Sequence, residues 1–199
     1  MHLRSLAASL CLLAVPLAAQ DMPKPGKEHL RLARIAGTYD SVIESQGGGQ
    51  TSTSKGEVAS KMDFGGFWLV EEFKADFGGM DFKGHAMTTF DTFKGKYVQT
   101  WIDSMAPVLL VLEGDFDKDG KVLTMTGKAA GPDGKPVTYR NVTTWKDDNS
   151  YTLEMNIVGE DGKSAGTMKV SYTRRAGKAA ETAAPKKAEP KKGDPAPKK

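Results

Sequence analysis

Cysteine is almost absent from this 199-residue chain, in which Cys11 is the only one. It lies within the first 20 residues, where an arginine, an apolar run and small residues follow one another in the layout of a cleavable export signal. We expect cleavage near Ala19 or Gln20, and therefore a mature protein without disulfides or thiolate metal sites. The signal predicts a location in the periplasm or outside the cell.

Long apolar runs and a basic excess are also missing from the rest of the chain. After the first 20 residues no apolar run is long enough for a membrane span. Residues 21–175 carry 20 basic and 22 acidic side chains, which argues against a nucleic-acid-binding protein because few cations are left to neutralise phosphates.

The C-terminal residues 176–199 consist mainly of Lys, Pro, Ala and Glu, without an aromatic or large aliphatic side chain. Such a composition predicts a disordered tail, because nothing in it can offset the entropy lost on ordering. Two uses of the tail fit: a solvated linker, or a weak contact with anionic polymers of the cell envelope.

Residues typical of familiar catalytic sites are scarce. Beyond the signal the histidines are His29 and His85, and no HExxH, GxSxG, GxGxxG or P-loop pattern occurs. We expect no metal and no cofactor, and we expect His85 on the surface or rim because it alternates with polar neighbours.

What the sequence does have is a series of strand-like runs joined by turns that contain Gly and Asp. The runs are 38–45, 53–62, 67–77, 82–92, 96–105, 107–116, 121–129, 137–146, 150–158 and 166–175. They predict an all-β fold, an up-and-down antiparallel β-barrel of about ten strands at residues 37–175. The preceding segment, residues 21–36, predicts a short helix over 26–36, with Leu30, Ala33 and Ile35 apolar and Gly37 as its stop.

One turn resembles a calcium loop. Asp115, Asp117, Asp119 and Gly120 match the first half of the EF-hand pattern. The closing glutamate is missing, since Thr126 occupies its position, and the flanking runs favour strands. We therefore expect a hairpin turn here, as at Asp-Gly pairs 133–134 and 161–162.

Alternation along the strands indicates which side chains face the interior. It places Glu71 with Phe73, Trp101 with Tyr97 and Asp103, and both Met155 and Tyr172 inward. A buried carboxylate is costly unless it is paired, so inward acids often mark ligand or catalytic sites. Arg140 is the candidate partner for them, with a structural ion pair or plain exposure as alternatives. The candidate ligand-binding residues are Glu71, Phe73, Tyr97, Trp101, Asp103, Arg140, Met155 and Tyr172.

The run at 107–112, "PVLLVL", is apolar on both faces. Its outer face requires a cover, from the helix, from a second subunit or from other packing, so an oligomer through residues 108–112 is one expectation.

The segments "GTYDSVIES", "GGFWLVEEF", "FKGHAMTTFDTFKGKYVQTWIDSM", "GDFDKDGKVLTMTG" and "SYTRR" together resemble the bacterial domain of unknown function 1579 family. The resemblance covers nearly all of residues 28–175 and implies a lipocalin-like, or calycin, barrel. It also implies that Gly37, Tyr39 and Arg174 or Arg175 close one barrel end, with Tyr39 in place of the tryptophan of related barrels. Related barrels that bind haem use a histidine near the C-terminus, which this chain lacks.

Two main uses of such a barrel follow. The first is an exported protein that binds a small apolar or amphipathic molecule without catalysis. The second is an enzyme acting on a small hydrophobic substrate with Glu71, Asp103 and Arg140 as its polar groups. A structural or partner-binding barrel without a ligand is the remaining alternative.

Overall fold

The computed structural model describes residues 22–47, 49–131 and 134–176. The expected export signal, Asp133 and residues 177–199 of the expected tail lie outside the described residues. Within them the chain forms one short α-helix, a 3-10 turn and ten strands. These elements are α1 (Lys27–Ala33), β1 (Gly37–Gly47), β2 (Gln50–Asp63), η1 (Phe64–Gly66), β3 (Trp68–Asp76), β4 (Asp81–Asp91), β5 (Lys96–Asp103), β6 (Leu110–Phe116), β7 (Val122–Ala130), β8 (Pro136–Trp145), β9 (Ser150–Gly159) and β10 (Ser164–Arg174).

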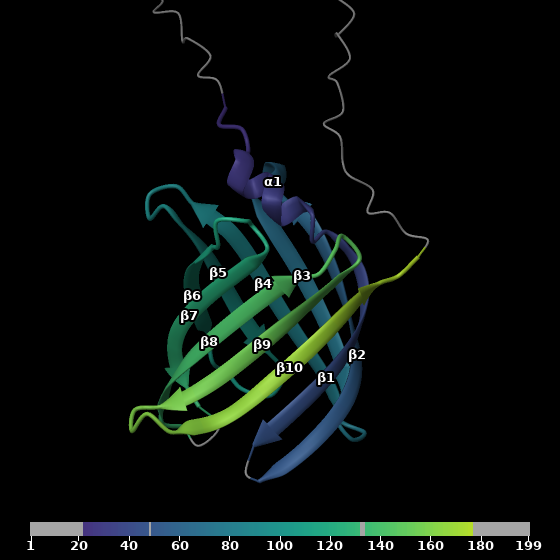
Figure 1. The fold of residues 1–199 in the computed structure, drawn as a ribbon, viewed down its shortest axis with the longest axis vertical. Helices are drawn as coiled ribbons and strands as arrows, with labels where there is room; N and C mark the ends of the chain where they lie inside the picture. The colour runs from purple at the N-terminus through teal and green to yellow at the C-terminus, as the bar shows by residue number, and fades with distance from the viewer. Residues whose placement is uncertain (1–21, 48, 132–133, 177–199) are drawn as a thin grey trace, which may run out of the picture.

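The strands form a closed barrel. Each strand pairs antiparallel with the next along the chain, and β1 pairs with β10 (Figure 1). The predicted up-and-down barrel is thereby confirmed. The clearest difference in strand bounds is at β6, which begins at Leu110 rather than Pro107. The Asp103 carboxylate accepts the backbone N–H groups of Met105 and Ala106, which starts a loop, and proline has no N–H for a ladder.

Helix α1 lies across one end of the barrel, over β2, β3 and β4 (Figure 1). It is shorter than predicted, and its buried face differs from the expected one. Leu30 is 64% exposed, whereas His29, Leu32 and the following Ile35 are buried. The sequence-based face was wrong because it left out His29, whose Nδ1 accepts the N–H of Gly26 and whose ring packs edge-on against aromatic side chains.

The segment that resembles a calcium loop forms the turn between β6 and β7. The Asp117 carboxylate accepts the backbone N–H groups of Lys121 and Val122 at 2.8 and 3.1 Å. Gly120 has a φ of 67°, the left-handed conformation that glycine adopts without strain. These contacts account for the carboxylate at position 117 through the geometry of the hairpin.

Arg174 ties β10 to the chain segment that enters the barrel. Its guanidinium donates to the carbonyl oxygens of Ala36, Arg34 and Asp148 at 2.7, 2.9 and 3.0 Å. It also lies over the Tyr39 ring, 4.6 Å from the centroid. Gly37 leaves the room for this contact, because a Cβ there would be 2.1 Å from Arg174 Nη1.

A chain of touching rings crosses the barrel below α1. We call it the aromatic layer; it runs from His29 through Phe90, Tyr97, Phe116, Trp145 and Tyr151 to Tyr172. Successive ring centroids are 4.3 to 6.3 Å apart, within or near the usual range for aromatic pairs. The Tyr97 hydroxyl also donates to the carbonyl of Glu28 in α1 at 3.2 Å. Helix and rings together close this end of the barrel.

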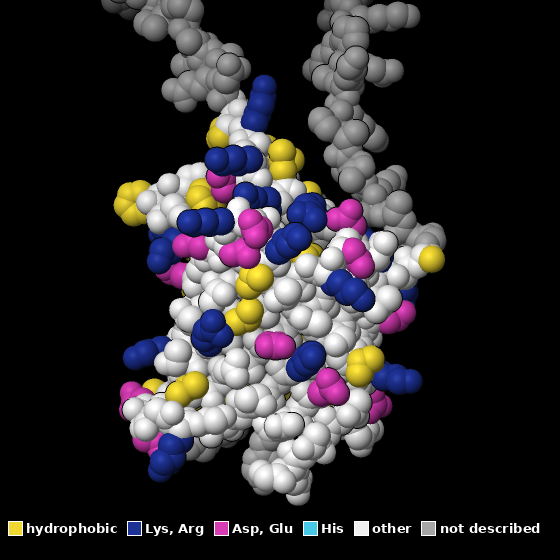
Figure 2. All heavy atoms as spheres, in the orientation of Figure 1, with side chains coloured by type: hydrophobic (Ala, Val, Ile, Leu, Met, Phe, Trp, Pro, Cys, Tyr) yellow, Lys and Arg dark blue, Asp and Glu magenta, His cyan; other side chains and the backbone are white. Residues whose placement is uncertain are grey.

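The outer surface mixes both signs of charge. Figure 2 shows Lys and Arg side chains gathered around α1 and interspersed with Asp and Glu on this face. Three exposed side chains beside one another are apolar instead: Ile102 in β5, Leu109 just before β6 and Val111 in β6, which we call the outer apolar patch. Leu110 and Leu112 of the same strand are buried inside. Helix α1 lies over β2, β3 and β4, so the expected cover of this strand by the helix is not found.

Candidate functional site

A cavity of about 280 Å³ occupies the barrel interior. It extends from Leu32 and Ile35, at the end that α1 closes, to Phe77 and Met105 at the opposite end. Met105 lines the cavity and is 60% exposed, so the cavity reaches the surface at the end opposite α1. Its volume is close to the lower limit of ligand pockets, about 300 Å³.

Most of the cavity wall is apolar. The side chains come from every strand of the barrel, because each strand turns alternate residues inward. At the open end Phe73, Phe82 and Trp101 contact one another, with centroid separations of 5.9 to 6.4 Å. The other apolar lining residues include Ile43, Val58, Leu69, Ala86, Leu110, Leu112, Leu123, Met125, Leu153, Met155, Met168 and Val170.

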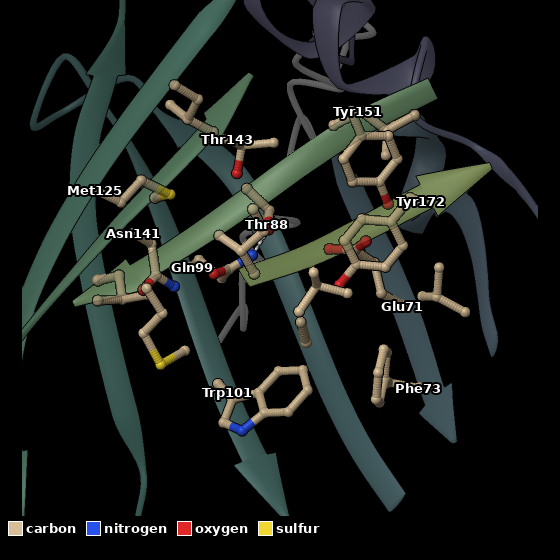
Figure 3. A pocket seen from close by; sticks show the side chains of 18 of the residues that line it. Glu71, Phe73, Thr88, Gln99, Trp101, Met125, Asn141, Thr143, Tyr151 and Tyr172 are labelled. Atoms are coloured by element: carbon tan, nitrogen blue, oxygen red, sulfur yellow. Dashed lines mark hydrogen bonds between the residues drawn. The ribbon is translucent and has the colours of Figure 1, made fainter. Parts of the chain in front are cut away.

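Polar side chains form a belt between the two aromatic ends. The polar belt consists of Glu71, Thr88, Gln99 and Asn141, from β3, β4, β5 and β8. In Figure 3 these residues lie between Tyr151 on the α1 side and Trp101 on the open side. Gln99 Nε2 donates to Thr88 Oγ1 at 3.0 Å, which joins two members of the belt.

Glu71 is the acidic group of the cavity. Its Oε1 accepts a hydrogen bond from the Ser60 hydroxyl at 3.2 Å. Burial raises the pKa of Glu71 from 4.5 to about 7, and the hydrogen bond from Ser60 and the charge of His85 only partly oppose this. The carboxyl group therefore exchanges its proton near neutral pH.

Tyr151 and Tyr172 stand beside Glu71. Their rings stack at 4.3 Å, and Figure 3 shows both next to the carboxyl group. Burial raises the pKa of each hydroxyl, and the negative charge of Glu71 raises it further. Both hydroxyls thus remain protonated, and neutral, at physiological pH.

Asn141 has an unsatisfied polar atom in the cavity wall. The residue is 7% exposed, and its Oδ1 has no hydrogen-bond partner among the described residues. A buried acceptor left without a donor costs about 1–3 kcal/mol.

Of the eight candidate residues from sequence, five line the cavity: Glu71, Phe73, Trp101, Met155 and Tyr172. Tyr97 is buried in the aromatic layer instead. Arg140 is exposed on the outer face of β8, so the expected pairing of Arg140 with an inward carboxylate is not found. The strand turns Asn141, one residue further, toward the cavity.

Asp103 lies at the end of β5 and does not line the cavity. Its Oδ2 accepts the indole N–H of Trp101 at 2.9 Å, while Oδ1 accepts backbone N–H groups of the following loop. Asp103 therefore holds Trp101 and the loop at the open end in place. Gly84 on β4 completes the Trp101 site, since a Cβ there would be 2.3 Å from the indole ring.

Four further residues line the cavity that were not among the candidates from sequence: Thr88, Asn141, Thr143 and Tyr151. The signal for Asn141 was present in the alternation of β8, where Val137 and Trp145 face inward and share its parity. Arg140 has the opposite parity, and its side chain is exposed.

The described residues contain no group of three or more His, Cys, Asp or Glu side chains placed to hold a metal ion. In the same residues, no helix combines the length and the apolar character needed to cross a membrane.

Solved structures with a similar fold include the S-type phycobiliprotein lyase CPES from Guillardia theta. The TM-score is 0.51 at 11% sequence identity, and the alignment covers 77% of this chain and 100% of that one. A redesigned β-barrel aligns with a TM-score of 0.41 at 10% identity, over 77% of this chain and 99% of that chain. The similarity to the lyase shows a lipocalin-like fold.

Among curated proteins, no sequence matches this chain significantly. The model of the family "Protein of unknown function (DUF1579)" matches residues 24–174. The match spans most of the chain and confirms the resemblance noted in the sequence. The protein is therefore a member of the DUF1579 family, with a lipocalin-like barrel.

Proposed function

We propose that this protein binds a small apolar or amphipathic molecule in its barrel cavity. The observation that carries the proposal is the cavity of about 280 Å³, closed at the α1 end and lined by apolar side chains around a polar belt. A site of this kind buries the apolar part of a ligand, which supplies affinity, while a few polar groups orient it.

A cavity-filling variant tests this function. Ala86 lines the cavity, is 2% exposed, and pairs with Glu71 on one side and Trp101 on the other. Ala86→Phe therefore places a ring in the middle of the cavity. The matched control is Met87→Phe, at the next residue of β4, which does not line the cavity.

The measurement is the fluorescence enhancement of N-phenyl-1-naphthylamine, a neutral apolar probe. We expect saturable binding by the parent protein and by Met87→Phe, and its loss in Ala86→Phe, with circular dichroism showing that each variant is folded. Equal binding by Ala86→Phe, or no binding by the parent, would contradict the proposal. Mass spectrometry of small molecules that co-purify with the protein then identifies the natural ligand.

Catalysis is the second candidate function, and Glu71 favours it. A carboxyl group with a pKa of about 7 in an apolar cavity is suited to proton transfer at neutral pH. The test incubates the co-purifying molecules with the protein and follows them by mass spectrometry. A product formed by the parent but not by Glu71→Gln supports an enzyme; unchanged molecules with both proteins support binding alone.

Export of the protein is also part of the proposal. It rests on the signal-like layout of residues 1–20, and the basic residues 176–199 supply a weak contact with anionic envelope polymers after export. N-terminal sequencing of the protein isolated from its cells tests the first point, with a mature start near residue 20 or 21 as the expected result. A protein that retains Met1 would contradict export through cleavage.

A further inference from the structure

The chemistry of the polar belt points to the head group of the ligand. Of the described residues that line the cavity, none is Lys, Arg or His, while Glu71 supplies a carboxylate. Asn141 Oδ1 adds an acceptor that has no donor. The cavity therefore offers acceptors to a head group that donates hydrogen bonds, and its formal charge is negative or zero.

An anionic head group meets an unfavourable site here. A carboxylate that enters the cavity loses its hydration and finds no cation among the lining residues. It also comes close to Glu71, which is a like charge once ionised. A hydroxyl or an ammonium group binds more favourably, because both groups donate hydrogen bonds. The ammonium group also neutralises the charge of Glu71.

We infer that the cavity selects small amphiphiles whose head group donates hydrogen bonds, an alcohol or an amine, and rejects amphiphiles with a carboxylate head. This inference rests on the proposed binding function and adds the class of ligand to it. Glu71 and Asn141 are the residues that determine the selection. The apolar wall holds the hydrocarbon part, which all three classes share.

Three ligands with the same eight-carbon chain and different head groups test the inference: 1-octanol, octylammonium and octanoate. Their affinities are measured by calorimetric titration at pH 8. Glu71 is ionised at this pH because its pKa is about 7. We expect octanol and octylammonium to bind at least about tenfold more tightly than octanoate, a difference of about 1.4 kcal/mol. Octanoate binding as tightly as the other two would overturn the inference while leaving the binding function in place. Failure of all three ligands to bind would contradict the binding function itself.

Two variants assign the selection to residues. Glu71→Gln removes the charge and keeps the shape, so it should weaken octylammonium and strengthen octanoate. The control is Glu72→Gln, the same change at the neighbouring exposed residue, which pairs with His85 outside the barrel; it should leave all three affinities unchanged. A preference that survives Glu71→Gln in full would overturn the role of Glu71.

The variant Asn141→Leu tests the role of Asn141 separately from that of Glu71. It keeps a similar volume and removes the free acceptor, so octanol and octylammonium should bind about fivefold more weakly, the effect of one hydrogen bond. Octanoate should bind as before. Unchanged binding of octanol and octylammonium would overturn the assignment of Asn141.

Discussion

At the scale of a single residue, Glu71 makes the free energy of unfolding depend on pH. Its pKa is 4.5 ordinarily and about 7 in the fold, so between these values the folded state holds a proton that the unfolded state has released. Stability therefore falls as the pH rises through this window. The cost to stability is absent below about pH 4.5, where both states are protonated, and complete above about pH 7.

Glu71→Gln should remove this dependence. Between pH 5 and pH 8 the parent should lose about 2–3 kcal/mol of unfolding free energy relative to the variant. Urea denaturation of both proteins at the two pH values measures the difference. If the unfolding free energies of the two proteins changed equally with pH, Glu71 would titrate near its ordinary pKa and would not be buried.

The inward orientation of individual side chains could be predicted in part from the sequence. Alternation predicted that Glu71 and Trp101 face inward, and both line the cavity. It could not show that Asp103 turns at the strand end to accept the indole N–H of Trp101, because that contact depends on the loop that follows. Arg140 and Asn141 differ by one position, and a charge-based choice selected the outer of the two.

At the scale of elements, Arg174 joins β10 to the segment between α1 and β1. Arg174→Ala removes three hydrogen bonds from a charged donor and the contact over Tyr39. We expect a loss of about 3 kcal/mol in unfolding free energy, since charged hydrogen bonds contribute about 1.5–3 kcal/mol each but do not add fully.

The neighbouring arginine provides the control for this prediction. Arg175 pairs with Asp40 and Glu57 in exposed ion pairs. Arg175→Ala should cost less than about 1 kcal/mol, the usual value of surface pairs. Chemical denaturation of both variants tests the contrast, and equal losses would show that Arg174 does not hold the barrel end.

Element types were easier to predict from sequence than the packing of the helix. The strands alternate and end at Gly and Asp turns, so their number and order follow from local pattern. Helix α1 has 7 residues, too few for a clear periodicity, and its buried face is set by the barrel end below it. His29 is buried there among Phe67 and Phe90, which no helical pattern of apolar residues indicates.

At the scale of the whole molecule, the described residues form two apolar regions that an added amphiphile could contact. One is the cavity, and the other is the outer apolar patch of Ile102, Leu109 and Val111. Sequence predicted a closed barrel, but the size of its cavity depends on how all inward side chains fill the interior together. The cavity was therefore beyond prediction from the alternation of individual strands.

The most direct test of the account is a two-dimensional ¹⁵N–¹H spectrum of the protein titrated with 1-octanol. The indole N–H of Trp101, hydrogen-bonded to Asp103, reports on the open end of the cavity, and the side-chain amides of Gln99 and Asn141 report on the polar belt. We predict saturable shifts of these three signals, with the backbone signals of Leu109 and Val111 unchanged. Shifts confined to Ile102, Leu109 and Val111 would place the amphiphile on the outer apolar patch and contradict binding in the cavity.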